Sequence, residues 1–580
     1  MNSFARASLV CVLCLAWTSQ QTAYAQRLSV TAAAASDPVS LLKTGFDLEK
    51  SRDWVKAVQH YEMALRAFPE NGDIKRRLLI SRLHNDVVRR STDSAIDDMI
   101  GHVSASEALD LYSEVLARLE MSYVEPLPLT EVVRSGTAYF EVALTEPSFV
   151  SRHLHGQSPV AVEKFRTSIH HVTLAYRVTN RFEARSVVAK AAQEAQQQLH
   201  IEPAATVMQF VFGAVCLLDP YSSFLSSGEL NEVESQIEGN FVGLGIALQP
   251  HAAPLRILNV IPGGPALEAG LESGDLIVEI GSVNCVDVGA ERAADLLRGP
   301  EQSQVRLLIQ KVDGSQIERV VVRRRVEVPS IEGVKLLEPT SGVAYLKINS
   351  FQKTTAPELD EALWSLQRQG MQSLIIDVRG NPGGWLDAAI AVADRFLAEG
   401  GIVSTRGKNG IENQNYSATR SGTWQVPLVL LIDDQSASAS EILAGAIRDN
   451  NRGVLVGETT YGKGSVQGLF HTKSLSSGIR LTVSKFYSPS GKAIAEKGVQ
   501  PNVAVADEQD ADENVPNQSN DHQPNATVAD EQGIALHFVA KKPPNGSTQT
   551  AASAQDKVLE VAIDQARRSL LTAQTQAAHK

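Results

Sequence analysis

The fold is decided by residues Ser373–Gly384, which read SLIIDVRGNPGG. Its first seven residues are almost continuously apolar, which is typical of a strand buried on both faces. A glycine-rich turn follows, and residues 385–397 then have a helical pattern that stops at two glycines. Strands and helices alternate over 342–501, with a second buried strand at 426–433 and a helix at 439–449. This alternation predicts an α/β core.

The size and composition of the chain indicate a folded protein of several domains. It has 580 residues, which at about 150 residues per domain predicts three to five units. Apolar residues make up 43% and charged residues 21% of the chain, as in ordinary folded proteins. The formal net charge is −12, which argues against nucleic acid as a partner.

The first 25 residues predict a secretory signal peptide rather than a buried N-terminal helix. Arg6 precedes a short apolar run over 7–17, and Ala23–Ala25 has the small-x-small pattern of a cleavage site. We therefore expect an exported protein, in the periplasm of a Gram-negative-type bacterium, with no integral membrane span after cleavage. Cleavage leaves Cys216 and Cys285, for which one disulfide and two buried free thiols are both consistent with the sequence.

The N-terminal part has helical periodicity. Residues 26–95 contain a stretch over 54–69 that resembles one tetratricopeptide repeat, and an ordinary helical hairpin is the alternative. A second helical region is predicted over 96–232 and is interrupted by prolines. Four histidines lie in it without companion carboxylates or cysteines, so we expect no metal site there: His153, His155, His170 and His171.

Residues 233–327 change to short β runs separated by glycine turns. The run 241–248, the turn and short helix over 262–271, and the strand over 274–280 together resemble a PDZ domain. Such domains hold the terminal carboxylate of a peptide with the backbone N–H groups of a glycine-containing loop. A β-barrel module without a ligand is the alternative. The expected carboxylate loop consists of Val242, Gly243, Leu244, Gly245 and Ile246.

Two places in the α/β core combine a strand end, a tight turn and a helix start, at 379–384 and 435–441. Helix starts leave backbone N–H groups that can hold an oxyanion. Taken alone, the first is also explained as a glycine turn and the second as a capping box between Ser438 and Glu441. A third element, Gly457–Gln467, nearly matches a phosphate-binding loop. It has glycine where that loop needs a hydroxyl, so we do not expect a nucleotide site.

Together these elements resemble the C-terminal processing peptidase (tail-specific protease) family of serine proteases. The resemblance covers about 200–505 and rests on segments DVRGNPGG, SASASEI and GKGSVQ, supported by LDPYSSFL, YSPSG and GVQP. It implies a ClpP/crotonase-like core over 328–505, a serine endopeptidase activity and no cofactor. It also implies that Ser438 is the nucleophile, that Lys463 is the general base and that Gln467 orients the lysine. Asp449 falls where some members have an important aspartate, and a structural role there is equally consistent.

The implied chemistry places demands on the site. A lysine acts as a base only when neutral, so its pKa must fall from about 10.4 toward 7–8, which corresponds to about 4 kcal/mol against the ammonium form. We therefore expect a dry pocket around Lys463 without a close carboxylate. The oxyanion is expected to bind the N–H of Ala439 and that of Gly383 or Gly384.

We thus predict a multidomain α+β protein. Its PDZ domain selects protein substrates with apolar C-terminal tails and, by the family resemblance, gates the catalytic site. The competing function is a non-catalytic scaffold built from tetratricopeptide-like and PDZ surfaces. The N-terminal helices are expected to bind an adaptor or a second copy of the chain. An acidic flexible linker is predicted at 506–535 and a helical tail at 536–580.

Overall fold

The computed structural model describes residues 37–249, 252–473, 475–505 and 556–578. The predicted signal peptide and acidic linker lie outside these residues. The chain forms two compact units. The first comprises 1–231, 400–417 and 462–498, and the second comprises 232–399, 418–461 and 499–580. Each is described by itself below.

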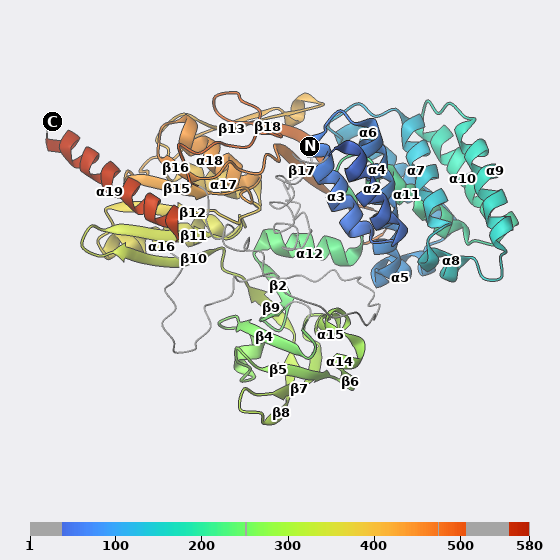
Figure 1. Ribbon diagram of the computed structural model, residues 1–580, viewed down its shortest axis with the longest axis horizontal. Coiled ribbons are helices and arrows are strands. Elements are labelled where there is room, and N and C mark those ends of the chain that lie inside the picture. Colours follow the sequence, from blue (N-terminus) through green and yellow to red (C-terminus); the bar gives the residue numbers. More distant parts are fainter. Residues whose placement is uncertain (1–36, 250–251, 474, 506–555, 579–580) are drawn as a thin grey trace, which may run out of the picture. The chain divides into compact units, whose positions relative to one another are not determined.

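The first unit is mainly helical, as predicted (Figure 1). The prolines mark helix starts: Pro147 and Pro203 each occupy the first turn of a helix, where a missing N–H costs nothing. The helices are α2 (Pro38–Lys50), α3 (Trp54–Ala67), α4 (Gly72–Thr92), α5 (Ser94–His102), α6 (Ala105–Ser122), α7 (Leu129–Ala143), α8 (Pro147–His153), α9 (Pro159–Leu174), α10 (Arg181–Leu199) and α11 (Pro203–Cys216).

The first three helices pack around a small apolar core. In α2, Gly45 is buried against the ring of Tyr61 on α3, and a Cβ there would come within 2.2 Å of the ring. Ala57 and Ala64 are buried on the same face of α3. The helical hairpin is therefore present, and its assignment as a tetratricopeptide repeat stays a prediction.

The first unit also contains an antiparallel sheet made from distant segments. Its strands are β1 (Ser223–Leu225), β13 (Gly401–Gly407), β14 (Gln414–Ser417), β17 (Ser465–His471) and β18 (Gly478–Tyr487). The strand β18 pairs with β1, β13 and β17. Two parts of the predicted core thus belong to the same unit as the N-terminal helices.

The PDZ-like region has its own buried core, which includes Cys285. The predicted run 241–248 is two strands, β2 (Asn240–Gly243) and β3 (Ile246–Leu248), because the chain turns at Gly245, where φ is 76°. β2 pairs with β9 (Arg324–Glu327), and β3 lies at one end of a second sheet. The other elements are β4 (Leu255–Val260), α13 (Pro265–Glu268), β5 (Leu276–Ile280), β6 (Val283–Asn284), α14 (Cys285–Val288), α15 (Ala290–Leu297), β7 (Gln304–Gln310) and β8 (Gln316–Val322).

The predicted α/β core is a six-stranded sheet in the second unit, in the order β10-β11-β12-β15-β16-β19 (Figure 1). All its pairs are parallel except β10 with β11. The strands are β10 (Ile331–Glu338), β11 (Val343–Ile348), β12 (Ser373–Asp377), β15 (Leu428–Ile432), β16 (Val454–Gly457) and β19 (Val503–Ala504). The helices that connect them are α16 (Thr355–Arg368), α17 (Leu386–Asp394) and α18 (Ala439–Asp449). Along the chain, the first unit passes into the second within α12 (Ser227–Glu238). A 3-10 turn, η1 (Gly410–Glu412), belongs to the first unit.

Both faces of this sheet are covered. The C-terminal helix α19 (Lys557–Ala578) packs Val558, Ala562 and Ala566 against one face, which contains Ile375 and Val429 (Figure 1). Neighbouring strand residues point the opposite way and are also buried. The strands β12 and β15 are therefore apolar at successive positions, because α19 packs on the second face of the sheet.

Candidate functional site

Two turns form one edge of the parallel sheet. One follows β12 and the other follows β15, and these strands are neighbours in parallel register, with Asp377 opposite Leu431. Carboxyl ends of adjacent parallel strands meet at the same edge, where α/β proteins bind their ligands. The two turns singled out from the sequence therefore lie together.

The first turn requires glycine. Gly384 has φ of 151°, and a Cβ on it would lie 1.8 Å from the carbonyl oxygen of Phe351. The N–H of Gly383 donates to Oδ1 of Asn381 at 2.7 Å. Of the two glycines predicted as oxyanion donors, Gly383 thus already has an acceptor for its N–H, and Gly384 is the better candidate.

The second turn holds Ser438 in a strained conformation. Its φ is 53° and its ψ is −106°, a combination that costs a non-glycine residue about 1–3 kcal/mol. The side chain is buried, with 6% exposed, and the residue immediately precedes α18. Its carbonyl accepts the N–H of Ile442, and Ala439 is the first residue of the helix. Such strain persists where the surroundings impose it, and it is typical of catalytic residues.

A buried carboxylate imposes this conformation. Glu441, which is 0% exposed, accepts the N–H of Ser438 at 2.7 Å through Oε2. Its Oε1 accepts the hydroxyl of Thr460, also at 2.7 Å. The Thr460 oxygen in turn accepts the N–H of Val499. The capping interaction predicted between residues 438 and 441 is therefore present, and it also connects to Thr460.

Hydrogen bonds connect the two turns directly. The Asp433 carboxylate accepts the N–H of Gly380 at 2.9 Å and that of Ser436 at 2.8 Å. The carbonyl of Asn381 accepts the Ser440 hydroxyl at 2.9 Å and the Ala437 N–H at 3.1 Å. Burial raises the pKa of Asp433, and the Gly380 N–H opposes that rise. Asp433 and Ser440 were not among the predicted site residues, although the position of Asp433 directly after a buried strand was a usable signal.

An arginine ties the first turn to the C-terminal helix. Arg379 donates to both oxygens of Asp556, at 3.0 and 2.9 Å, and also to Asp377. Asp556 accepts the N–H of Leu559 in the first turn of α19. Burial lowers the pKa of Arg379, but hydrogen bonds to these two carboxylates outweigh it and hold the pKa above its usual range.

The predicted base lies in the first unit. Lys463 is 6% exposed and stands between Gly462 and Gly464, both with positive φ. A Cβ at Gly464 would lie 2.3 Å from the backbone nitrogen of Ala495, so the chain there needs glycine. The Nζ atom of Lys463 lies 4.9 Å from the ring centroid of Tyr221. The lysine is therefore buried, and the dry pocket without a close carboxylate stays a prediction.

Gln467 lies on β17 of the same unit and is buried. Its Nε2 donates to the Ser465 hydroxyl at 3.0 Å and to the Thr482 hydroxyl at 3.4 Å. The structure thus places Ser438 and the glycine turn in one unit, and Lys463 and Gln467 in the other. Asp449 ends α18, where its carboxylate accepts Nε of Arg448, which is a helix-terminal position.

The predicted carboxylate loop lies between β2 and β3. The Leu244 carbonyl accepts the N–H of Ala266 and the Gly245 carbonyl accepts that of Ile261, both at 2.8 Å. These bonds direct the loop carbonyls into the domain. Val242 and Gly243 belong to β2, and Ile246 begins β3, the end strand of its sheet.

The described ranges contain neither a membrane-crossing helix nor a metal-binding cluster. None of the helices there combines the length and apolarity needed to cross a bilayer. No cluster of three or more histidine, cysteine or acidic side chains in those ranges is placed to hold a metal ion. The two cysteines within the described ranges, Cys216 and Cys285, are free thiols, so the open alternative between a disulfide and two thiols is resolved in favour of thiols.

Comparisons with known proteins agree with these features. Residues 342–505 match the model of peptidase family S41, and 256–311 match that of a PDZ domain. The carboxyl-terminal-processing protease of Picosynechococcus sp. is 35% identical over 50% of this chain and 70% of its own length. That of Synechocystis sp. is 34% identical over 50% of this chain and 68% of its own. A solved photosystem II D1 C-terminal processing protease is 23% identical, with a TM-score of 0.37, and the match covers 69% of this chain and 92% of that one. The chain therefore belongs to the carboxyl-terminal-processing proteases of peptidase family S41 and is a serine-type peptidase.

Proposed function

We propose that this chain is an exported endopeptidase that hydrolyses peptide bonds with Ser438 and Lys463 and selects its substrates by their C-terminal tails. The observation that supports it best is the buried, strained Ser438, fixed by Glu441 at the start of α18. Strained non-glycine conformations of this kind cluster at active sites, where the surroundings hold them in place.

The reaction proceeds in two steps. Neutral Lys463 takes the hydroxyl proton of Ser438, whose oxygen attacks the substrate carbonyl, and the resulting ammonium gives that proton to the leaving amine. Lys463 then takes a proton from the water that attacks the acyl-serine, and it gives this proton to the Ser438 oxygen as the acyl group leaves. The N–H groups of Ala439 and Gly384 hold the oxyanion in both steps, and losing one such donor typically costs about 100–1,000-fold in rate.

Gln467 orients the base. Because its Nε2 atom donates to Ser465 and Thr482, the carboxamide oxygen on the other side of the planar group is available to accept from an amine. We assign that oxygen to the amine of Lys463, which precedes Gln467 by four residues.

The chain connection between the two catalytic segments is short. The N–H of Tyr461 donates to the carbonyl of Ser436 at 3.0 Å, within the second unit. Ser436 precedes Ser438 by two residues, and Lys463 follows Tyr461 by two residues. This connection supports assigning the lysine to this serine.

The PDZ domain supplies the selection. Since the carbonyls of Leu244 and Gly245 bond inward, we assign the amides of the loop Val242–Ile246 to the terminal carboxylate of the substrate. β3 ends its sheet, so a substrate tail can add beside it as a further strand. Apolar tail residues are expected, since Ile246 and Leu248 are half-buried and pack on the core.

Two assignments rest on the sequence pattern. We assign export to the signal peptide, and N-terminal sequencing of the secreted chain should then begin at Gln26. We assign the N-terminal helices to binding an adaptor or a second copy.

The test compares the wild type with Ser438→Ala and Lys463→Arg on an unstructured protein that ends in apolar residues. Arginine keeps the charge but cannot become a neutral base at ordinary pH. Both variants should lose cleavage by at least about 1,000-fold. Lys485→Ala is the matched control, because this exposed lysine of β18 pairs with Glu125 and should be dispensable. Wild-type cleavage by Ser438→Ala would refute the assignment of Ser438 and Lys463 as the dyad.

Tail selection is tested separately with the Ser438→Ala chain. A labelled peptide with a free apolar C-terminus should bind it, and the same peptide with an amidated terminus should bind at least about tenfold more weakly. Equal binding of both peptides would refute the assignment of the loop, while leaving the dyad untouched.

A further inference from the structure

We propose that Tyr221 positions the Nζ amine of Lys463. The turn over residues 218–222, which contains Asp219, holds Tyr221 in place. This inference rests on the proposed function of Lys463. It concerns a residue far from the lysine in the sequence, in the same unit. The Lys463 Nζ atom lies 4.9 Å from the Tyr221 ring centroid, which is within the range for an amine over an aromatic face.

The turn that presents Tyr221 is fixed by hydrogen bonds. One Asp219 oxygen accepts the N–H groups of Tyr221 and Ser222, at 2.7 and 2.9 Å, and the other accepts the Ser222 hydroxyl at 2.7 Å. On the far side, Nε of Arg480 donates to the carbonyl of Tyr221 at 3.1 Å. The backbone on both sides of the ring is thus held in place.

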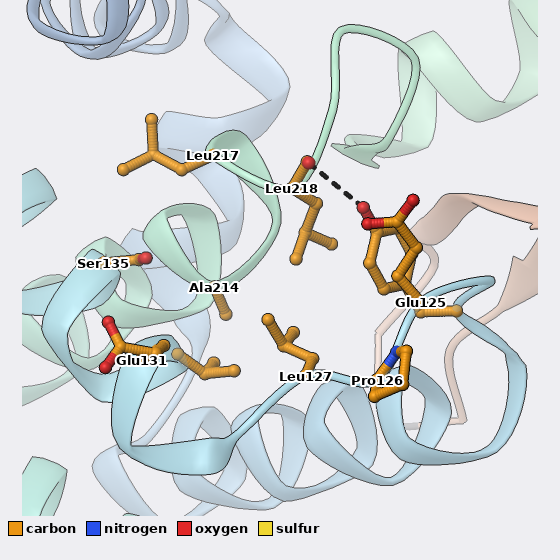
Figure 2. A pocket seen from close by; sticks show the side chains of 10 residues that line it. Glu125, Pro126, Leu127, Glu131, Ser135, Ala214, Leu217 and Leu218 are labelled. Atoms are coloured by element: carbon orange, nitrogen blue, oxygen red, sulfur yellow. Dashed lines mark hydrogen bonds between the residues drawn. The ribbon is translucent and has the colours of Figure 1, made fainter. Parts of the chain in front are cut away.

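The start of the turn is held in the same way. The Tyr123 hydroxyl donates to the carbonyl of Leu218 at 3.0 Å, the bond drawn in Figure 2. Burial, with Asp219 nearby, raises the pKa of Tyr123, so its phenol stays protonated and able to donate. This bond lies beside a cavity of about 220 Å³ lined in part by Leu127 and Leu217.

The turn also reaches the residue that orients the base. The Thr482 hydroxyl donates to Asp219 at 3.1 Å, and it accepts from Nε2 of Gln467 at 3.4 Å. Thr482 lies opposite Gln467 in the pairing of β17 with β18. One turn therefore supports Lys463 through the Tyr221 ring and Gln467 through Thr482, which a residue with a packing role alone would not do.

The ring acts on the amine in two opposing ways. Its face attracts an ammonium by about 0.5–2 kcal/mol, while its bulk keeps water away, which disfavours the ammonium by up to several kcal/mol for a buried group. Because Lys463 is buried, we expect the exclusion of water by the ring to outweigh this attraction. Asp219, Tyr123 and Arg480 are charged or titratable groups of this unit that contact the turn.

The test is a set of substitutions at Tyr221 in the full chain, with kcat and KM measured across pH. Tyr221→Ala should lower kcat about 10–100-fold, as expected for a misplaced catalytic group, with KM changed less than about threefold. Its activity should also rise toward higher pH than in the wild type, because water reaches the amine. Tyr221→Phe keeps the ring and should restore both the rate and the pH profile.

A matched control exists on the surface of the same unit. Tyr176 is 44% exposed and has Lys190 over its ring at 5.6 Å, so Tyr176→Ala removes a similar pair away from the proposed site. It should leave the rate and pH profile unchanged. Thermal unfolding is measured for every variant, and Tyr221→Leu, which keeps an apolar side chain, replaces Tyr221→Ala if that variant unfolds at the assay temperature.

The outcomes separate this inference from the proposed function. If Lys463→Arg is inactive while Tyr221→Ala has the kcat and pH profile of the wild type, only the role of Tyr221 is refuted. Equal losses in Tyr221→Phe and Tyr221→Ala would also refute it, because the ring would then not be the part that acts. Full activity of Lys463→Arg would refute the base and this inference together.

Discussion

Replacing Glu441 by alanine should disable the enzyme while leaving it folded. The Glu441 carboxylate is fully buried, and it accepts the Ser438 N–H and the Thr460 hydroxyl, both at 2.7 Å. The hydrogen bond from the Ser438 N–H to Glu441 holds Ser438 at its strained φ of 53°. In Glu441→Ala the Ser438 N–H has lost its acceptor, so nothing opposes relaxation of the serine backbone.

The size of the effect follows from these two contacts. A hydrogen bond to a buried charged group is worth about 1.5–3 kcal/mol, and the strain at a positive φ is of similar size. Losing the bond therefore changes the strained conformer of Ser438 from the dominant one to a minor one. At 1.4 kcal/mol per factor of ten, we expect kcat to fall about 10–150-fold.

Two further variants separate the hydrogen bond from its surroundings. Glu441→Gln keeps one carbonyl oxygen for the Ser438 N–H and should retain kcat within about fivefold. Thr460→Val removes the other donor to Glu441 and should lower the free energy of unfolding by about 1–3 kcal/mol with a smaller effect on kcat. Cleavage of an unstructured protein at saturating concentration gives kcat, and urea unfolding gives the stability.

Wild-type kcat in a folded Glu441→Ala variant would refute the claim that this carboxylate holds Ser438 in its reactive conformation. If Glu441→Gln instead loses as much activity as Glu441→Ala, the negative charge and not the hydrogen-bond geometry is what matters.

Three more results are expected. Asp556→Asn should lower the free energy of unfolding in urea by about 1–2 kcal/mol, because Arg379 then has one charged partner in place of two. The melting temperature should fall as pH drops from 6.5 toward 4, since burial lowers the pKa of His153 to about 4 and the unfolded chain takes up the proton first; His153→Gln should flatten this part of the curve. Cys216 and Cys285 should resist a thiol reagent at about pH 8 until urea is added, because burial raises the pKa of both thiols, that of Cys285 to about 11.

Each of these has a simple control. Arg567→Gln removes a more exposed contact of α19, with Glu338, and should cost less than about 0.5 kcal/mol, so an equal loss would contradict the special role of Asp556. His155→Gln, at an exposed position, should keep the wild-type pH curve. Rapid reaction of either thiol in the native chain would contradict its burial.

The sequence predicted the sheet and the serine turn well because the signals there are local. The predicted strand at 426–433 is β15, and the predicted helix at 439–449 is α18 with the same bounds. Continuous apolar runs and a capping residue are sufficient for such assignments. The glycines of the first turn were also found, since a close backbone approach excludes other residues at Gly384.

The contacts that fix the site could not be predicted, because each joins residues far apart in the sequence. Nothing near Glu441 indicates Thr460 as its second partner, and nothing near Gly380 indicates Asp433. The boundary between β2 and β3 was missed for a different reason. Apolar residues continue through Leu244, and only the positive φ of Gly245 separates the strands.

The C-terminal helix shows how the missing information bears on function. Its amphipathic pattern predicted α19, but a pattern does not specify which surface its apolar face covers. In the structure that surface is the sheet of the protease core, and Arg379 in the glycine turn binds Asp556 at the start of the helix. Without α19 one face of β12 and β15 would be exposed to water, and the turn next to Ser438 would lose an ion pair. The helix α19 is therefore part of the protease core, and removing residues 557–578 should cost both stability and activity.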